Sequence, residues 1–168
     1  MMSIKTPISD EVIEKLHIGD KVLLSGLIYT GRDAVLPRLC DLAVNNRIPD
    51  NIKLMGSVIF HTAVSRAGVG PTSSNKLEIE GSMPVLSKYG VKIHLGKGQI
   101  DNETVKELER YNSVYAIIPP VTALLNSKTI SKETAGFEDL GMEAMYQLQV
   151  VEYPIIIAAA HGESIYGR

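Results

Sequence analysis

Apolar residues along the chain gather into short runs that are separated by turn-forming and charged residues. Short apolar runs bounded by Gly, Pro or polar residues predict strands, and stretches with helical spacing between them predict helices. The predicted strands cover residues 21–29, 58–62, 91–95, 114–118 and 147–159. The predicted helices cover residues 10–16, 33–45, 75–88 and 102–111. Because the two kinds of element interleave, the sequence predicts an α/β fold.

Three residues interrupt the regular pattern of these elements. Gly26 lies inside the first strand, where a β-bulge or a close packing contact is expected. Pro37 lies near the first turn of the helix at 33–45, early enough to be tolerated but late enough to bend the helix. Pro154 has no N–H to donate within a sheet, so it indicates an edge position, a bulge or a break in the last strand.

The composition is that of one globular domain. The chain has 168 residues, of which 45% are apolar, and a formal net charge of −2. This length can bury a hydrophobic core, and no repeat, low-complexity tract or long linker divides residues 1–168. We therefore expect a single domain in which residues 1–8 form a short loose segment. The near-neutral charge offers no basic surface for nucleic acid and no polybasic face for a membrane.

The sequence lacks targeting signals and metal-ligand patterns. The longest apolar run, at 154–160, is far too short to cross a bilayer, and the N-terminus lacks the layout of a signal peptide, so we expect a cytoplasmic protein. The single cysteine, Cys40, excludes an internal disulfide and an iron–sulfur cluster held by this chain alone. The four histidines, at positions 17, 61, 94 and 161, lack the close spacing of a metal site, and we predict none.

Residues 57–78 have the layout of an anion pocket. An apolar strand is followed by a turn in which Gly and Pro residues between 68 and 71 allow a sharp bend. The hydroxyl residues 72–74 then present hydroxyls and backbone N–H groups at the positive end of the next helix. Asn75, followed three residues later by Glu78, is a variant of the capping box and predicts where this helix begins.

Arg32 follows the first predicted strand and precedes a helix. Its guanidinium could hold a substrate carboxylate through two parallel hydrogen bonds. The local sequence alone favours an ion pair with Asp33 or another surface acid, which would contribute little stability. We interpret Asp33 itself as a helix N-cap or as a residue that orients Arg32, and we place it outside the catalytic set.

Thr72, Lys76 and Lys97 are further candidates, each with an ordinary alternative. A threonine after Gly-Pro is nearly always a turn or cap residue, and its hydroxyl is too weakly acidic to act as a base unaided. Lys76 lies about one turn into the predicted helix, with its stem directed back toward the pocket. Lys97 lies between two glycines that allow close backbone approach, or else it is an ordinary exposed loop lysine.

Phosphate-binding motifs do not fit these residues. Five residues separate Gly90 from Gly96, and glycine follows the lysine, which excludes a P-loop. The Gly-Val-Gly at 68–70 lacks the third glycine of a dinucleotide fingerprint. His61 ends a strand just before the pocket and could reach a substrate, although a hydrogen-bonded structural imidazole is favoured. The role of His161 is open in the same way.

Four blocks of the sequence follow the order of one family's motifs. Residues 19–39 resemble its G-D-x-(V/I)-x-L-(S/T/N)-G-x-(I/L)-x-T-x-R-D block, and residues 70–78 resemble its GPTT-x-x-R-M-(D/E) signature. Residues 89–100 resemble its G-(V/M)-x-(L/I)-x-x-G-K-G-x block, and residues 137–166 resemble a closing segment with E-L-G-M-E and a final H/K-G-N/E. The family is that of the iron–sulfur-dependent class I fumarases and the β subunit of L-tartrate dehydratase, and the resemblance covers residues 8–166.

The resemblance implies a "swivelling" β/β/α domain, a layered form of the α/β class. It also implies that Arg32, Lys76 and Lys97 bind substrate carboxylates and that Thr72 removes the proton from the carbon next to a carboxylate. Such a threonine needs a strongly positive, water-poor setting, which Lys76 and Lys97 could provide, so Lys97 joins Thr72 in the catalytic set. The family usually has arginine at position 76, and lysine keeps the charge but loses the bidentate fork.

The activity implied by the resemblance is that of a hydro-lyase β subunit, equivalent to the C-terminal domain of a class I fumarase. It would hydrate fumarate reversibly to L-malate, as in the tricarboxylic acid cycle, in a site shared with an α subunit. That partner would carry a 4Fe-4S cluster as Lewis acid, in an assembly resembling α2β2, and this chain alone would be inactive.

Two alternatives stay open. The chain could be an L-tartrate dehydratase β subunit, because pocket shape decides between fumarate, tartrate and a methylated relative. It could also be a non-catalytic module that binds a di- or tricarboxylate. Lys76 in place of arginine, and Gln99 where glycine is common, favour that second alternative.

Overall fold

The computed structural model describes residues 1–65, 68–69, 76–119 and 122–167. Its helices are α1 (Asp10–Glu14), α2 (Leu36–Val44), α3 (Lys76–Lys88), α4 (Asn102–Arg110), α5 (Thr122–Ser127) and the 3-10 helix η1 (Glu138–Glu143). Its strands are β1 (Met2–Lys5), β2 (Lys21–Thr30), β3 (Val58–Phe60), β4 (Val64–Ser65), β5 (Gly68–Val69), β6 (Ile93–Gly96), β7 (Val114–Ile117), β8 (Thr129–Gly136), β9 (Met145–Ala160) and β10 (Glu163–Ser164). The predicted α/β class is confirmed, and the layered swivelling arrangement stays a prediction.

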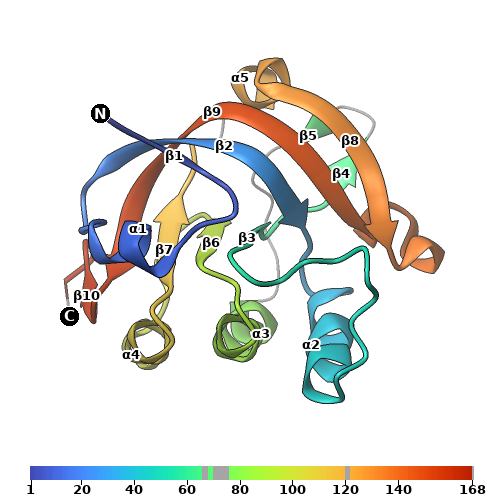
Figure 1. Cartoon of the computed structure of the whole chain (residues 1–168), viewed down its shortest axis with the longest axis horizontal. Coiled ribbons are helices and arrows are strands. Elements are labelled where there is room, and N and C mark those ends of the chain that lie inside the picture. Colours follow the sequence, from blue (N-terminus) through green and yellow to red (C-terminus); the bar gives the residue numbers. More distant parts are fainter. Residues whose placement is uncertain (66–67, 70–75, 120–121, 168) are drawn as a thin grey trace.

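One sheet curls until it pairs with itself, with β2 and β9 arching over β3, β6 and β7 (Figure 1). Strands β2, β3, β6 and β7 are neighbours in that order and run parallel. Strand β9 is antiparallel to both β7 and β2, and its Ile156 lies between Ile117 of β7 and Lys21 of β2. The long β9 therefore joins the two ends of the parallel set. Helices α2, α3 and α4 lie side by side beneath the parallel strands.

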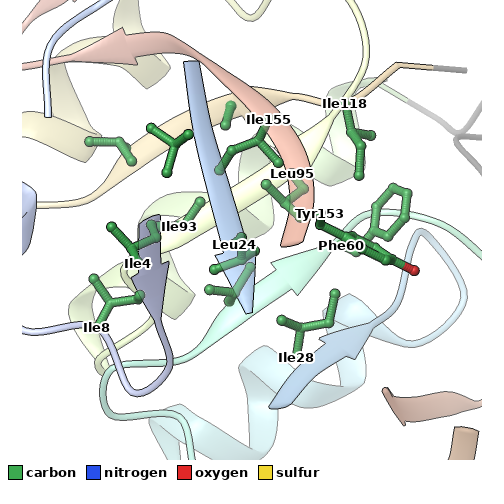
Figure 2. Packing of buried hydrophobic residues seen from close by; sticks show 14 of the residues in the cluster. Ile4, Ile8, Leu24, Ile28, Phe60, Ile93, Leu95, Ile118, Tyr153 and Ile155 are labelled. Atoms are coloured by element: carbon green, nitrogen blue, oxygen red, sulfur yellow. The ribbon is translucent and has the colours of Figure 1, made fainter. Parts of the chain in front are cut away.

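Alternation along the strands divides the buried side chains between two faces. Leu24, Phe60 and Leu95 belong to a core enclosed by the curled sheet, where they pack with Tyr153 of β9 (Figure 2). Ile59, the neighbour of Phe60, packs on the other face with the apolar residues of α2 and α3. The parallel strands are therefore buried on both faces, which explains why they appear in the sequence as continuous apolar runs.

The irregularity predicted at Gly26 is a β-bulge combined with close packing. Across from Ser25, strand β9 has two residues in place of one, and the N–H of Glu152 donates to Ser25 Oγ over 2.9 Å. Gly26 has a φ of 112°, and a Cβ there would overlap Thr6 Oγ1. Pro154 pairs with β2 close to this bulge. A bulge in the last strand, one of the three alternatives predicted from Pro154, is therefore confirmed.

Helix α2 begins at Leu36, three residues later than the predicted start at 33. The intervening residues form a turn in which the N–H groups of Val35 and Leu36 both donate to the carbonyl of Arg32. Pro37 therefore lies at the beginning of the helix, where its missing N–H costs no intrahelical hydrogen bond. The predicted start is wrong because a turn precedes the helix.

Elements without a regular apolar pattern escaped prediction. Most residues of β8 are exposed, so no alternation marks it as a strand. Residues 2–5, within the segment expected to be loose, form β1 parallel to β2, and Ile4 and Ile8 are buried in the core. No helix within the described ranges is long and apolar enough to cross a membrane.

Candidate functional site

The carboxyl ends of three parallel strands meet at one edge of the sheet. The N–H of Gly31, just after β2, donates to the carbonyl of Phe60 over 3.0 Å. The N–H of His61, just after β3, donates to the carbonyl of Leu95 over 2.9 Å. Arg32, His61 and Lys97 therefore follow three neighbouring strands at the same edge, which is where ligands bind in parallel α/β sheets.

Helix α3 begins at this edge. Its last residue, Lys88, lies a few residues before Ile93, the first residue of β6, so the helix runs back along the strands and its N-terminus lies at their carboxyl ends. Lys76 is the first helical residue, directly after the predicted start at Asn75. The side chain of Lys76 and all of Thr72 lie outside the part of the chain that the structure describes. Their assignments stay predictions.

Arg32 forms a bidentate ion pair with Glu143. Nε lies 2.9 Å from both carboxylate oxygens, and Nη2 lies 2.9 Å from Oε2. The side chains are only 24% and 27% exposed, so solvent screens the pair less than it would at an open surface. The hydrogen bonds that Arg32 donates to Glu143 raise the pKa of Arg32 above its ordinary value. Asp33, the partner suggested by the local sequence, is more distant, with its Oδ1 4.0 Å from Nε.

A second ion pair ties η1 to helix α2. Arg38 Nη1 lies 2.9 Å from Asp139 Oδ2, and the Arg38 guanidinium lies 5.0 Å from the centre of the Phe137 ring. Both partners of this ion pair are largely exposed, so it contributes little stability by itself. Together with the Arg32–Glu143 pair, it holds the segment before β9 against the turn that carries Arg32.

Lys97 is exposed on a short loop that follows β6. Gly98 has a φ of 79°, a conformation that favours glycine. The hydroxyl of Tyr115, on β7, donates to the carbonyl of Gly98 over 3.0 Å. A Cβ on Gly96 would lie 3.1 Å from the same hydroxyl, so this glycine allows the loop to approach the ring closely. A buried tyrosine thus braces the loop while Lys97 extends into solvent.

A chain of three buried polar side chains runs beneath the sheet. Ser87 Oγ, on α3, lies 2.8 Å from His94 Nε2, and His94 Nδ1 lies 3.0 Å from His61 Nε2. His94 is 0% exposed and His61 is 3% exposed. His61 Nδ1 has no hydrogen-bond partner among the described residues. The hydrogen-bonded imidazole favoured from the sequence is present, but one of its two nitrogens is unpaired.

Both histidines are neutral near pH 7. Burial lowers the pKa of His61 to about 3. Burial, followed by repulsion from His61, lowers the pKa of His94 well below its ordinary value. Each ring therefore carries one N–H, and it can both donate and accept a hydrogen bond.

His161 lies at the other end of the sheet. Its Nε2 is 2.9 Å from the carbonyl oxygen of Leu16, and its ring centre is 5.7 Å from that of His17. Leu16 precedes β2, so this pair lies near the amino ends of the parallel strands and does not join the candidate site.

The side chains of this chain do not fit an iron–sulfur cluster. Such a cluster takes about four cysteine thiolates, and Cys40 is the only cysteine in the sequence. Its Sγ lies 3.8 Å from the carbonyl oxygen of Ser82, and burial raises the pKa of the thiol. Within the described ranges, no group of three or more His, Cys, Asp or Glu residues could hold a metal ion.

The structure adds three residues that sequence reasoning did not assign. Glu143 lies in the closing block that resembles E-L-G-M-E, so a signal for it was present. Ser87 and His94 are marked by no motif, and their link to His61 depends on packing between α3 and the sheet. The guanidinium of Arg32, the ammonium of Lys97 and the neutral imidazole of His61 lie at one edge of the sheet. Together they can bind an anion that has several oxygen atoms to accept hydrogen bonds.

Comparison with known proteins identifies the family. A family model described as Fumarase C-terminus matches residues 1–168. A putative L(+)-tartrate dehydratase subunit beta of Methanocaldococcus jannaschii is 31% identical over 170 residues, which cover 92% of this chain and 85% of that protein. The L(+)-tartrate dehydratase subunit beta of Escherichia coli is 29% identical over 173 residues, which cover 95% of this chain and 84% of the relative.

A longer relative matches only in part. A putative fumarate hydratase class I of Geobacillus stearothermophilus is 28% identical over 180 residues, which cover 99% of this chain and 34% of that protein. The chain therefore spans about a third of this relative and most of the two dehydratase subunits. With its whole length matched by the family model, the chain belongs to the fumarase C-terminus family.

Proposed function

We propose that this chain is the β subunit, or the equivalent C-terminal domain, of a hydro-lyase that reversibly hydrates fumarate to L-malate. One observation carries the proposal beyond family membership. Arg32 and Lys97 follow β2 and β6, the strands on either side of β3, at the edge where α3 begins, so a guanidinium, an ammonium and a helix N-terminus lie at one edge of the sheet. A dicarboxylate has two anionic groups and suits this arrangement.

Each predicted residue has a role in this scheme. Arg32, oriented by Glu143, binds one carboxylate, and Lys97 and Lys76 bind carboxylate oxygens and stabilise negative charge that develops at the carbon next to the carboxylate. Thr72 exchanges the proton at that carbon, and the nearby cations favour its deprotonated form. The reaction adds water across the double bond, so one carbon gains a hydroxyl and the other gains a proton.

The proposed enzyme needs a second polypeptide. Two relatives are named as beta subunits, and a third is about three times as long as this chain. We place a 4Fe-4S cluster on an α subunit, because the cysteine content of this chain cannot ligate one. We expect an assembly resembling α2β2, with this chain inactive by itself.

Tartrate is the second candidate substrate. Two relatives that match over most of their length are named as tartrate dehydratase subunits, and their identities of 31% and 29% are slightly higher than the 28% of the fumarate hydratase relative. The same cations would bind tartrate, and loss of water would give oxaloacetate. A pocket distinguishes two such dicarboxylates by its contacts to the hydroxyl groups.

The test is anaerobic capture of the tagged full chain from its own source, followed by assays for cluster absorption, fumarate hydration and tartrate dehydration. We expect a brown, active eluate that contains a second polypeptide. The Thr72→Val variant should capture the same partner but show no turnover. A colourless, inactive eluate without a partner would refute the proposal, provided that a known iron–sulfur enzyme survives the same handling. Dicarboxylate binding by that eluate would instead indicate a non-catalytic binding module.

A further inference from the structure

We propose that His61 is an additional substrate-binding residue, whose Nδ1–H donates a hydrogen bond to a carboxylate oxygen between Arg32 and Lys97. The inference rests on the proposed function for the identity of the ligand. One ring nitrogen of His61 is unpaired. Buried polar atoms are nearly always hydrogen-bonded, and His61 Nδ1, on a side chain from a residue only 3% exposed, has no partner in the described part of the chain.

The position of His61 indicates what its partner is. It is the first residue after β3, and β3 lies between β2 and β6. Arg32 follows β2, and Lys97 follows β6. Any anion held by those two cations therefore lies across the end of the strand that carries His61.

The direction of the ring supports the same conclusion. His94 pairs with Ile59, two residues before His61, so the bond from His61 Nε2 to His94 points back along the sheet. The two nitrogens of an imidazole point in diverging directions. Nδ1 is therefore turned away from His94, on the side of the ring closer to the carboxyl edge.

The hydrogen bonds that link Ser87, His94 and His61 determine whether His61 Nδ1 donates or accepts. Because both rings are neutral, each holds a single proton, and the three groups must be ordered in one direction. When Ser87 donates to His94 Nε2, His94 Nδ1–H donates to His61 Nε2, and His61 carries its proton on Nδ1. A carboxylate only accepts hydrogen bonds, so it selects this order. His94 and Ser87 are thus positioning residues, and they hold His61 in the donor tautomer.

A neutral donor at this place differs from a third cation. It adds a directional hydrogen bond to the carboxylate without raising the positive charge of a site that already has Arg32 and Lys97. Its burial makes the bond stronger than an exposed one, because the effective dielectric constant around the ring is low. Substrate binding, more than the proton-transfer step, should therefore depend on His61.

Two substitutions separate binding from support of the fold. The amide of glutamine can occupy the place of Nε2 and keep the bond to His94, but it leaves Nδ1 without a replacement. The amide of asparagine can occupy the place of Nδ1, but it loses the bond to His94. His61→Gln should raise KM about tenfold or more with kcat within about threefold, whereas His61→Asn should keep KM within about threefold. His161→Gln, at the other end of the sheet, is the matched control and should behave like the wild type.

The experiment measures KM and kcat for fumarate and tartrate on the captured complex, with a thermal melt of each variant. Unchanged KM in His61→Gln overturns the inference, as does an equal rise in KM for His61→Gln and His61→Asn, which would indicate a structural role alone. If the wild-type complex shows no turnover, the proposed function fails separately. Calorimetric titration with L-malate and tartrate then tests the inference by comparing the affinities of His61→Gln and His61→Asn in place of their KM values. Absence of binding by the wild type overturns the inference.

Discussion

Arg32 and Glu143 lie 111 residues apart in the sequence, and their side chains form a bidentate ion pair with 2.9 Å contacts. The pair connects the turn after β2 to the end of η1. A guanidinium held by both Nε and Nη2 has a fixed plane, which reduces the conformational entropy that Arg32 would lose on binding a ligand. Glu143 is therefore a positioning residue for the candidate site, although no substrate is expected to touch it.

Glu143→Gln should weaken substrate binding more than catalysis. The amide removes one acceptor and the negative charge, so Arg32 loses its fixed orientation, and KM should rise about tenfold, or about 1.4 kcal/mol. Steady-state kinetics of the complex measure this change. Asp139→Asn is the matched control, because it breaks the exposed pair with Arg38 on the same segment and should change KM less than about twofold. Equal effects of the two substitutions would contradict the positioning role.

Acid should destabilise the fold through the buried histidines. The pKa of His61 is about 3 in the folded state, against 6.5 for an ordinary histidine, so the unfolded chain binds more protons between these values. Stability is therefore fully present above pH 6.5 and falls as the pH drops from 6.5 toward 3. From about pH 7.5 to about pH 5, His61 alone should cost about 2 kcal/mol of unfolding free energy.

Urea titrations at a series of pH values test this dependence. His61→Asn removes one titrating group, so its stability should decline less steeply over the same range. His17→Asn, which changes an exposed histidine that precedes β2, serves as the control for replacing a histidine outside the buried pair. A wild-type slope in His61→Asn would show that His61 is not the group responsible.

Tyr115→Phe should loosen the loop that carries Lys97. The change removes only the hydroxyl that donates to the carbonyl of Gly98, so the unfolding free energy should fall by about 1 kcal/mol. It should also lower kcat/KM about threefold to tenfold if Lys97 acts on the substrate. Tyr153→Phe is the control, since that buried hydroxyl bonds to Thr129. We expect Tyr153→Phe to lose a similar amount of stability without a change in kcat/KM. A larger loss of kcat/KM in Tyr153→Phe than in Tyr115→Phe would refute the bracing role of Tyr115.

Gly26→Ala should destabilise the sheet where β2 meets the bulge in β9. A Cβ at this position would overlap Thr6 Oγ1, and the φ of 112° is unfavourable for alanine. We expect a loss of about 2 kcal/mol or more in urea unfolding. Gly81→Ala is the matched control inside α3, where a Cβ meets no atom within 4 Å. It should be neutral or stabilising by up to about 1 kcal/mol, because alanine favours helix.

Local sequence patterns predicted most elements that build the candidate site. The strands that became β3, β6 and β7 were placed within about two residues at either end, because a short apolar run with polar or glycine boundaries is a local signal. The prediction that His61 ends a strand is close to the structure, where His61 directly follows β3. The bulge at Gly26 was also predicted, since a glycine inside a strand weakens regular pairing and often marks a bulge or a close backbone approach.

Contacts between distant segments could not be derived in this way. No periodicity in residues 21–45 indicates that Arg32 will meet Glu143, and none indicates that His61 will meet His94. These pairs depend on the register of β3 against β6 and on the path by which β9 returns to pair with β2. That path is set by long-range packing of the enclosed core, so the local pattern determined which elements form, while the closing of the sheet decided which of their side chains lie together.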